Sequence, residues 1–207
     1  MATLTRLHCV IGSAGQIWQA LALALHHTRE RAAFGRLLVD QPLMRTVLAD
    51  LALESEAATL LAMRLASSFE AAEDDPVARA WRRIVTPAAK FWICKRGVEL
   101  AGEAMEIWGG NGYVEDGPMA RLFRDMPVNS IWEGSGNVMC LDVLRAIARD
   151  REGADALFHD LAERCVKDAR LTSEIAALTA ALRLPPDEQE AHARRFVQRL
   201  VLVAQSA

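Results

Sequence analysis

Residues 42–73 read PLMRTVLADLALESEAATLLAMRLASSFEAAE, a long segment with no glycine and no proline after its first residue. Its apolar side chains recur at spacings of three, four or seven residues, which places them on one face of a helix. Proline suits the first turn of a helix, because its missing N–H would be unpaired there anyway. The segment therefore predicts one long helix that begins at Pro42 and turns one face to a core. The stripe consists of Leu43, Val47, Leu51, Ala58, Leu61 and Leu65.

Two more long helices are predicted on either side of this one. Residues 4–31 keep an apolar face and contain no proline, and a third helix is expected from the turn at residues 73–76 to about Ile107. Pro87 lies inside the third helix and is expected to bend it. Valine, isoleucine, threonine and tyrosine form no alternating runs, so the sequence predicts no strand.

Two glycine-rich breaks follow these helices. Residues 108–118 hold four glycines and a proline and are expected to form an irregular loop. Residues 131–137 form the second break, after which residues 138–148 predict a fourth long helix. Beyond Asp150 one or two further amphipathic helices are expected, split at Pro185-Pro186.

The fold class predicted from these patterns is all-α. Long helices joined by short turns are typical of an up-and-down bundle, here a four-helix bundle over residues 1–150. Residues 151–207 are expected to form a helical C-terminal extension. The composition, 52% hydrophobic but only 6% aromatic, is that of a helical protein more than of a sheet.

Charge and composition exclude several classes of function. The net charge of -3 gives no overall field that would attract a polyanion. The five histidines and four cysteines show no metal-ligand spacing, so no metal site is predicted and the cysteines are expected to be free buried thiols. Ser130 and Ser135 lack the Gly-x-Ser-x-Gly context of a hydrolase. Without a signal sequence or an apolar run of about 18 residues, we expect a cytoplasmic protein that does not span a membrane.

Glu133 is an acidic residue flanked by aromatic and glycine residues. Trp132 beside it can exclude water, and partial burial raises the pKa of a carboxyl group toward the range useful for a base. The residues after it stand before a helix, where free N–H groups can hold an anion. The alternative is that Ser135 or Asn137 only caps that helix.

A second candidate region combines an arginine with a glycine loop. The first helix ends with Arg29 and Arg31, where a cation either complements the end of the helix or binds a pyrophosphate. Gly109–Gly112 can bring backbone N–H groups against a phosphate, or can be a simple turn between helices.

Five motifs occur in one order along the chain: Arg31-Ala-Ala-Phe34-Gly35 with Gln41, Lys90, Gly109-Gly110-Asn111-Gly112-Tyr113, Arg124-Asp125 and Ile131-Trp132-Glu133-Gly134-Ser135. Together they resemble the C-terminal helical domain of the acyl-CoA dehydrogenase family. The resemblance covers about residues 4–150 and is nearest to the AidB-type branch, the adaptive-response proteins linked to alkylation stress.

The resemblance implies α,β-dehydrogenation of an acyl-CoA thioester. Enzymes of this family remove a proton from the α-carbon while the β-hydrogen leaves as hydride to FAD, and Glu133 stands at the position of the usual base. Arg6 and Trp132 match positions near the substrate.

The resemblance also implies FAD as the cofactor and a set of residues that contact it. Arg31, Phe34 and Gln41 match positions that reach FAD from a neighbouring subunit. Four further positions match contacts with the pyrophosphate or with FAD in the same subunit: Gly109, Gly110, Ser135 and Asn137.

The family normally has an N-terminal helical domain and a middle β-domain, neither of which this sequence contains. The resemblance therefore implies a homo-oligomeric oxidoreductase, dimer or tetramer, of which this chain is one part, with little FAD binding or turnover alone. An interaction domain that binds duplex DNA is the alternative, and a purely structural bundle is a third interpretation. The arginines that would favour DNA are Arg145, Arg149, Arg194, Arg195 and Arg199.

Overall fold

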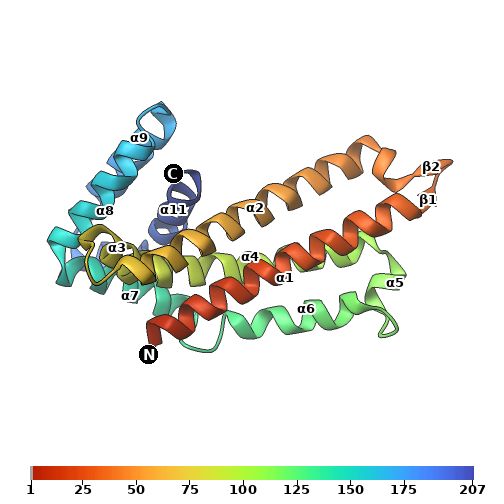
Figure 1. The fold of residues 1–207 in the computed structure, drawn as a ribbon, viewed down its shortest axis with the longest axis horizontal. Helices are drawn as coiled ribbons and strands as arrows, with labels where there is room; N and C mark the ends of the chain where they lie inside the picture. Colours follow the sequence, from red (N-terminus) through yellow and green to blue (C-terminus); the bar gives the residue numbers. More distant parts are fainter. Residues whose placement is uncertain (1) are drawn as a thin grey trace.

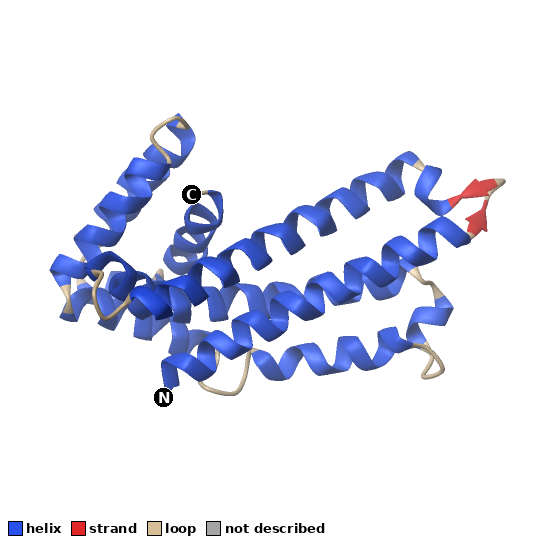
Figure 2. Ribbon diagram, in the orientation of Figure 1, coloured by secondary structure: helices blue, strands red, loops and turns tan. Residues whose placement is uncertain are grey.

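The computed structural model describes residues 2–207, and a bundle of helices that lie side by side runs along its length (Figure 1). Helix α1 (Ala2–Glu30) packs against α2 (Pro42–Ala71) and α4 (Thr86–Ile107), and α4 packs against α6 (Pro118–Asn129). The predicted all-α fold is confirmed (Figure 2). The fourth helix of this bundle is α6, which was not predicted from the sequence.

The predicted third helix is continuous but changes its pitch near Pro87. It consists of α3 (Pro76–Ala80), a π-helical turn η2 (Trp81–Val85), and α4. Pro87 has no N–H to offer the carbonyl group four residues before it, so the regular hydrogen-bond ladder is interrupted there. The wide turn allows the helix to continue past the proline.

A small hairpin contradicts the expectation that the chain has no strand. Strand β1 (Ala32–Ala33) pairs antiparallel with β2 (Arg36–Leu37), followed by the short 3₁₀ helix η1 (Leu38–Asp40). Phe34 and Gly35, between the strands, have φ of 54° and 82°. Positive φ at both central residues matches the twist of a two-residue hairpin, but phenylalanine is rare at such a position, so the hairpin has little signal in the sequence.

The expected loop at residues 108–118 contains one helical turn, α5 (Gly110–Tyr113), so the prediction of wholly irregular structure was wrong. Helix α7 (Gly136–Arg149) follows the second break as expected. Residues 151–207 then form more helices than predicted. They are α8 (Arg151–Arg164), α9 (Ala169–Ala181), α10 (Pro186–Ala191) and α11 (Ala193–Ser206).

The C-terminal helices return to the bundle. Asp150 and Asp168 cap α8 and α9 through their carboxylates, and α11 packs against α2, α4 and α7. Buried side chains from the long helices and from α11 form one continuous cluster, which includes Ile17, Leu65 and Leu200. The extension therefore shares the core of the bundle.

Helix α1 is long and apolar enough to cross a membrane by length and composition alone. In the structure 44% of its apolar window is buried, and the core helix of a bundle meets the same criterion. The four cysteines are free and buried, as expected. Within residues 2–207 no group of three or more His, Cys, Asp or Glu side chains could hold a metal ion.

Candidate functional site

Glu133 lies in the turn between α6 and α7, in an uncommon backbone conformation. Its φ is 58°, and the φ of Gly134 is 106°. The positive φ of Gly134 favours glycine, and a Cβ atom there would lie 2.5 Å from the Cε atom of Met139, whose side chain would have to move. This tight turn sets the direction in which the Glu133 side chain leaves the backbone.

Two cationic side chains donate hydrogen bonds to carbonyl groups of this turn. The Nε atom of Arg6 donates to the carbonyl oxygen of Glu133 at 3.2 Å, and the Nζ atom of Lys90 donates to that of Gly134 at 2.9 Å. Arg6 also pairs with Asp142 on α7 at 2.6 Å, and Arg83 binds the other carboxylate oxygen at 2.9 Å. Burial acts to raise the pKa of Asp142, but the hydrogen bonds from Arg83 and Arg6 outweigh it and lower that pKa.

Glu133 and Trp132 line a pocket of about 240 Å³, here called the Glu133 pocket. Cys9, on α1, lies in its wall, and burial raises the pKa of the Cys9 thiol. Trp132 remains 54% exposed and Glu133 is exposed, so within this chain the expected shielding of the carboxylate from water is not found. Arg6 does not line the pocket but supports its backbone. The other lining residues are Thr5, His8 and Asn129.

Three of the predicted cofactor residues meet at a second pocket, of about 310 Å³, here called the Arg31 pocket. It brings together Arg31, Gly109 and Gly110. Gly109 has a φ of 59°, and no atom lies within 4 Å of a Cβ position at either glycine, so the backbone is open to an approaching group.

An aromatic pair that the sequence analysis missed forms part of the same pocket. His27 and Trp108 stack with their ring centroids 4.7 Å apart, and the indole nitrogen of Trp108 donates to the carbonyl oxygen of Leu23. Burial, together with Arg31, lowers the pKa of His27, which favours its neutral form. The spacing between residues 27 and 108 gives no sign of this contact in the sequence.

The remaining predicted cofactor residues are divided between the two regions. Phe34 is 98% exposed at the tip of the hairpin, and Gln41 steadies that hairpin by donating from Nε2 to the carbonyl oxygen of Ala33 at 3.1 Å. Ser135 occupies the N-cap position of α7, but its hydroxyl makes no capping hydrogen bond. Asn137 accepts a hydrogen bond from Arg194 at 3.1 Å. The alternative that Ser135 or Asn137 only caps α7 therefore lacks the capping hydrogen bond that it requires.

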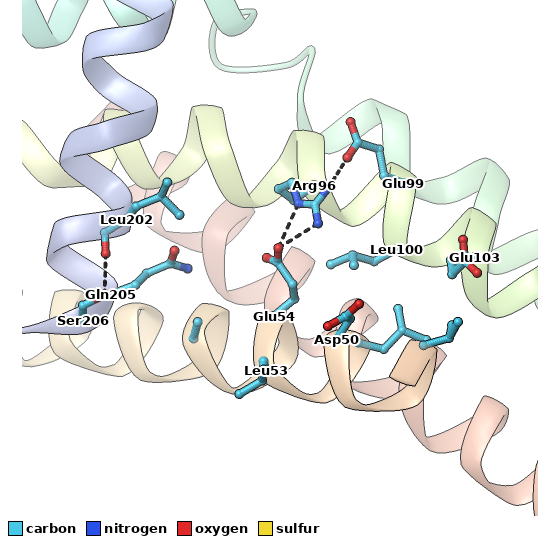
Figure 3. Close-up of a pocket in the computed structure, with 13 residues that line it drawn as sticks. Asp50, Leu53, Glu54, Arg96, Glu99, Leu100, Glu103, Leu202, Gln205 and Ser206 are labelled. Atoms are coloured by element: carbon cyan, nitrogen blue, oxygen red, sulfur yellow. Dashed lines mark hydrogen bonds and ion pairs between the residues drawn. The ribbon is translucent and has the colours of Figure 1, made fainter. Parts of the chain in front are cut away.

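A third pocket, of about 730 Å³, lies between α2, α4 and α11 (Figure 3). Arg96 lies there against Glu54, at 2.7 Å, and against Glu99. None of the predicted site residues lines this pocket.

Comparisons with known proteins assign most of the chain to one family. The family described as acyl-CoA dehydrogenase, C-terminal domain, matches residues 1–148. The protein AidB of Escherichia coli (strain K12) is 45% identical over 188 residues, covering 91% of this chain and 35% of AidB. The chain therefore spans about a third of that relative.

Two solved structures of acyl-CoA dehydrogenases have the same fold as this chain. Caenorhabditis elegans ACDH-11 in complex with C11-CoA has a TM-score of 0.83 at 25% identity, covering all of this chain and 40% of its own. An acyl-CoA dehydrogenase from Bacillus anthracis complexed with FAD shares the fold, with a TM-score of 0.79 at 16% identity over 99% of this chain and 40% of its own. The chain belongs to the acyl-CoA dehydrogenase family and corresponds to its C-terminal domain.

Proposed function

We propose that this chain supplies the catalytic base and part of the FAD site of an acyl-CoA dehydrogenase of the AidB-like branch. Glu133 carries the proposal, because its carboxylate leaves a constrained turn at a pocket that it shares with Trp132. In this role Glu133 takes the α-proton of an acyl thioester. The complex of ACDH-11 with C11-CoA supports a thioester as the class of substrate.

FAD would supply the acceptor for the β-hydrogen. The Arg31 pocket suits its diphosphate, since Arg31 offers a charged donor and Gly109 and Gly110 leave the backbone open. The flat His27–Trp108 stack beside them suits an aromatic ring such as adenine. Ser135 and Asn137, at the start of α7, are proposed to contact FAD beside Glu133.

The two pockets lie too far apart to act on one FAD within a single copy. Cys9 lines the Glu133 pocket and His27 the Arg31 pocket, both on α1. The two residues are 18 positions apart, so with a rise of about 1.5 Å per residue they lie about 27 Å apart along the helix. We propose that each FAD is shared by two copies of a cytoplasmic homo-oligomer, a dimer or a tetramer, with Phe34 and Gln41 reaching the neighbouring site.

The arginines that would favour duplex DNA give little support to that alternative. Arg194 bonds Asn137 and lies over the ring of Phe91, and Arg199 pairs with Glu174. Part of the expected basic cluster is therefore used in contacts within the chain.

The proposal is tested by titrating the chain with FAD and with FAD plus a branched acyl-CoA, while flavin fluorescence and absorbance are recorded. Bleaching in the wild type that is lost in Glu133→Gln supports the proposal. Glu70→Gln, a change of an exposed glutamate on α2, is the matched control. Equal bleaching in Glu133→Gln and wild type would refute the role of Glu133. Where FAD does not bind the chain alone, the same comparison is made in an assembly that includes the other domains of the family.

A further inference from the structure

Lys90 on α4 is a charged side chain that is 1% exposed. Burying an ammonium group is unfavourable unless it is paired. None of the ion pairs found within residues 2–207 includes Lys90. Its hydrogen bond runs instead to the carbonyl oxygen of Gly134, 44 positions away, at 2.9 Å. The buried ammonium group of Lys90 therefore donates a hydrogen bond to the backbone of one turn.

That turn contains Glu133 in the left-handed region, at a φ of 58°. A non-glycine residue persists there only when its surroundings hold it, since the conformation is unfavourable by about 1–3 kcal/mol. The carbonyl of Glu133 belongs to the peptide plane before Gly134, and the carbonyl of Gly134 to the plane after it. Arg6 bonds the first and Lys90 the second, so both planes around Gly134 are fixed.

We propose that Lys90 is a positioning residue for Glu133, which fixes the turn from α4 while Arg6 fixes it from α1. The role of Lys90 in catalysis rests on the proposed function, whereas its effect on the conformation of the turn is independent of that function. Lys90 lies outside the lining of the Glu133 pocket, so it acts through the backbone and not on the substrate.

Hydrogen exchange in the 207-residue chain tests the effect on the turn without FAD or substrate. The amides of Ile131 and Trp132 bond the carbonyl oxygen of Val128 at 3.0 and 3.1 Å and report on the stability of the turn. In Lys90→Met, which removes the charge and the donor, we expect both amides to exchange about tenfold faster or more, as for a lost charge-assisted bond.

The control is Lys167→Met, which removes an exposed lysine and is expected to leave both amides unchanged. Lys90→Gln keeps an N–H donor and is expected to exchange at an intermediate rate, and it serves as the test where Lys90→Met does not fold. Unchanged exchange of Ile131 and Trp132 in a folded Lys90→Met or Lys90→Gln would overturn the proposal.

A second measurement separates positioning from general stability. In a flavin-loaded assembly whose wild type is active, Lys90→Met is expected to lower kcat about tenfold or more with little change in KM, because the thioester contacts remain while the base is displaced. A change in KM alone would overturn the positioning role. An inactive wild type would refute the proposed function and leave the exchange result standing.

Discussion

Arg6 on α1 and Asp142 on α7 form an ion pair of 2.6 Å across 136 positions of sequence. Arg83 of the π-helical turn binds the same carboxylate at 2.9 Å. These ion pairs join α1, the π-helical turn and α7 through the Asp142 carboxylate. Arg6 also donates a hydrogen bond to the carbonyl oxygen of Glu133. The position of the proposed base therefore depends on contacts that span most of the chain.

Asp142→Asn is expected to lower the free energy of unfolding by about 1–3 kcal/mol, because two arginines lose a charged partner in a partly buried place. The Asp142 side chain is only 17% exposed. Urea denaturation of the wild type and the variant measures the change. Asp155→Asn, at an exposed position on α8, is the control. Equal losses in the two variants would contradict the importance of this pair.

The stability conferred by Asp142 is expected to depend on pH in acid. Its pKa is lowered in the folded protein, so the unfolded chain binds the proton more readily. The contribution is complete above the unfolded pKa of about 3.9 and is lost as the pH falls through the lowered folded pKa. Below about pH 4 the free energy of unfolding should therefore fall more steeply in the wild type than in Asp142→Asn. Parallel curves would show that the carboxylate is not coupled to folding.

Gly134→Ala is expected to destabilise the protein by about 1–3 kcal/mol, since alanine would have to adopt a positive φ. Its Cβ atom would also meet Met139. Gly12→Ala is the contrasting variant, because no atom lies within 4 Å of a Cβ at this exposed position in α1. Alanine is favoured over glycine in a helix by about 1 kcal/mol, so this change should stabilise. Thermal unfolding of both variants measures the difference, and a change of the same sign in both would contradict the contrast between these two glycines.

Arg31→Gln is expected to weaken binding of FAD, or of ADP as a probe of its diphosphate end, about tenfold or more, because a charge-assisted hydrogen bond is lost. Isothermal titration calorimetry on the FAD-binding assembly measures the affinity. Arg29→Gln removes a neighbouring exposed arginine that does not line the pocket and should have little effect. Equal weakening by both substitutions would indicate a general effect of charge and no specific site.

The four cysteines are expected to react slowly in the folded protein. All are buried, and burial raises the pKa of Cys94 and of Cys140 to about 11. Because the thiolate is the reactive form, Ellman's reagent at about pH 8 should modify the native chain slowly and all four thiols after denaturation. A thiol that reacts in the native chain as fast as free cysteine would contradict this burial.

Two of the sequence predictions that went wrong have different physical causes. The Phe34-Gly35 hairpin was missed because it depends on a rare positive φ at phenylalanine and on strands of only two residues. Helix α6 was overlooked because glycine and proline before it, and Pro127 within it, interrupt the pattern that indicates a long helix. Packing against α1 and α4 stabilises α6, although its local sequence does not indicate a long helix.

By itself the sequence determined the fold class and the order of the motifs, because the helical period of apolar residues and the glycine breaks are local properties. It also singled out Glu133 and the glycines at 109 and 110. Only the tertiary structure decided which groups meet: the Arg6–Asp142 pair, the bond from Lys90 to Gly134 and the His27–Trp108 stack all join distant segments. Such contacts follow from the packing of helices in space, which no single stretch of sequence encodes.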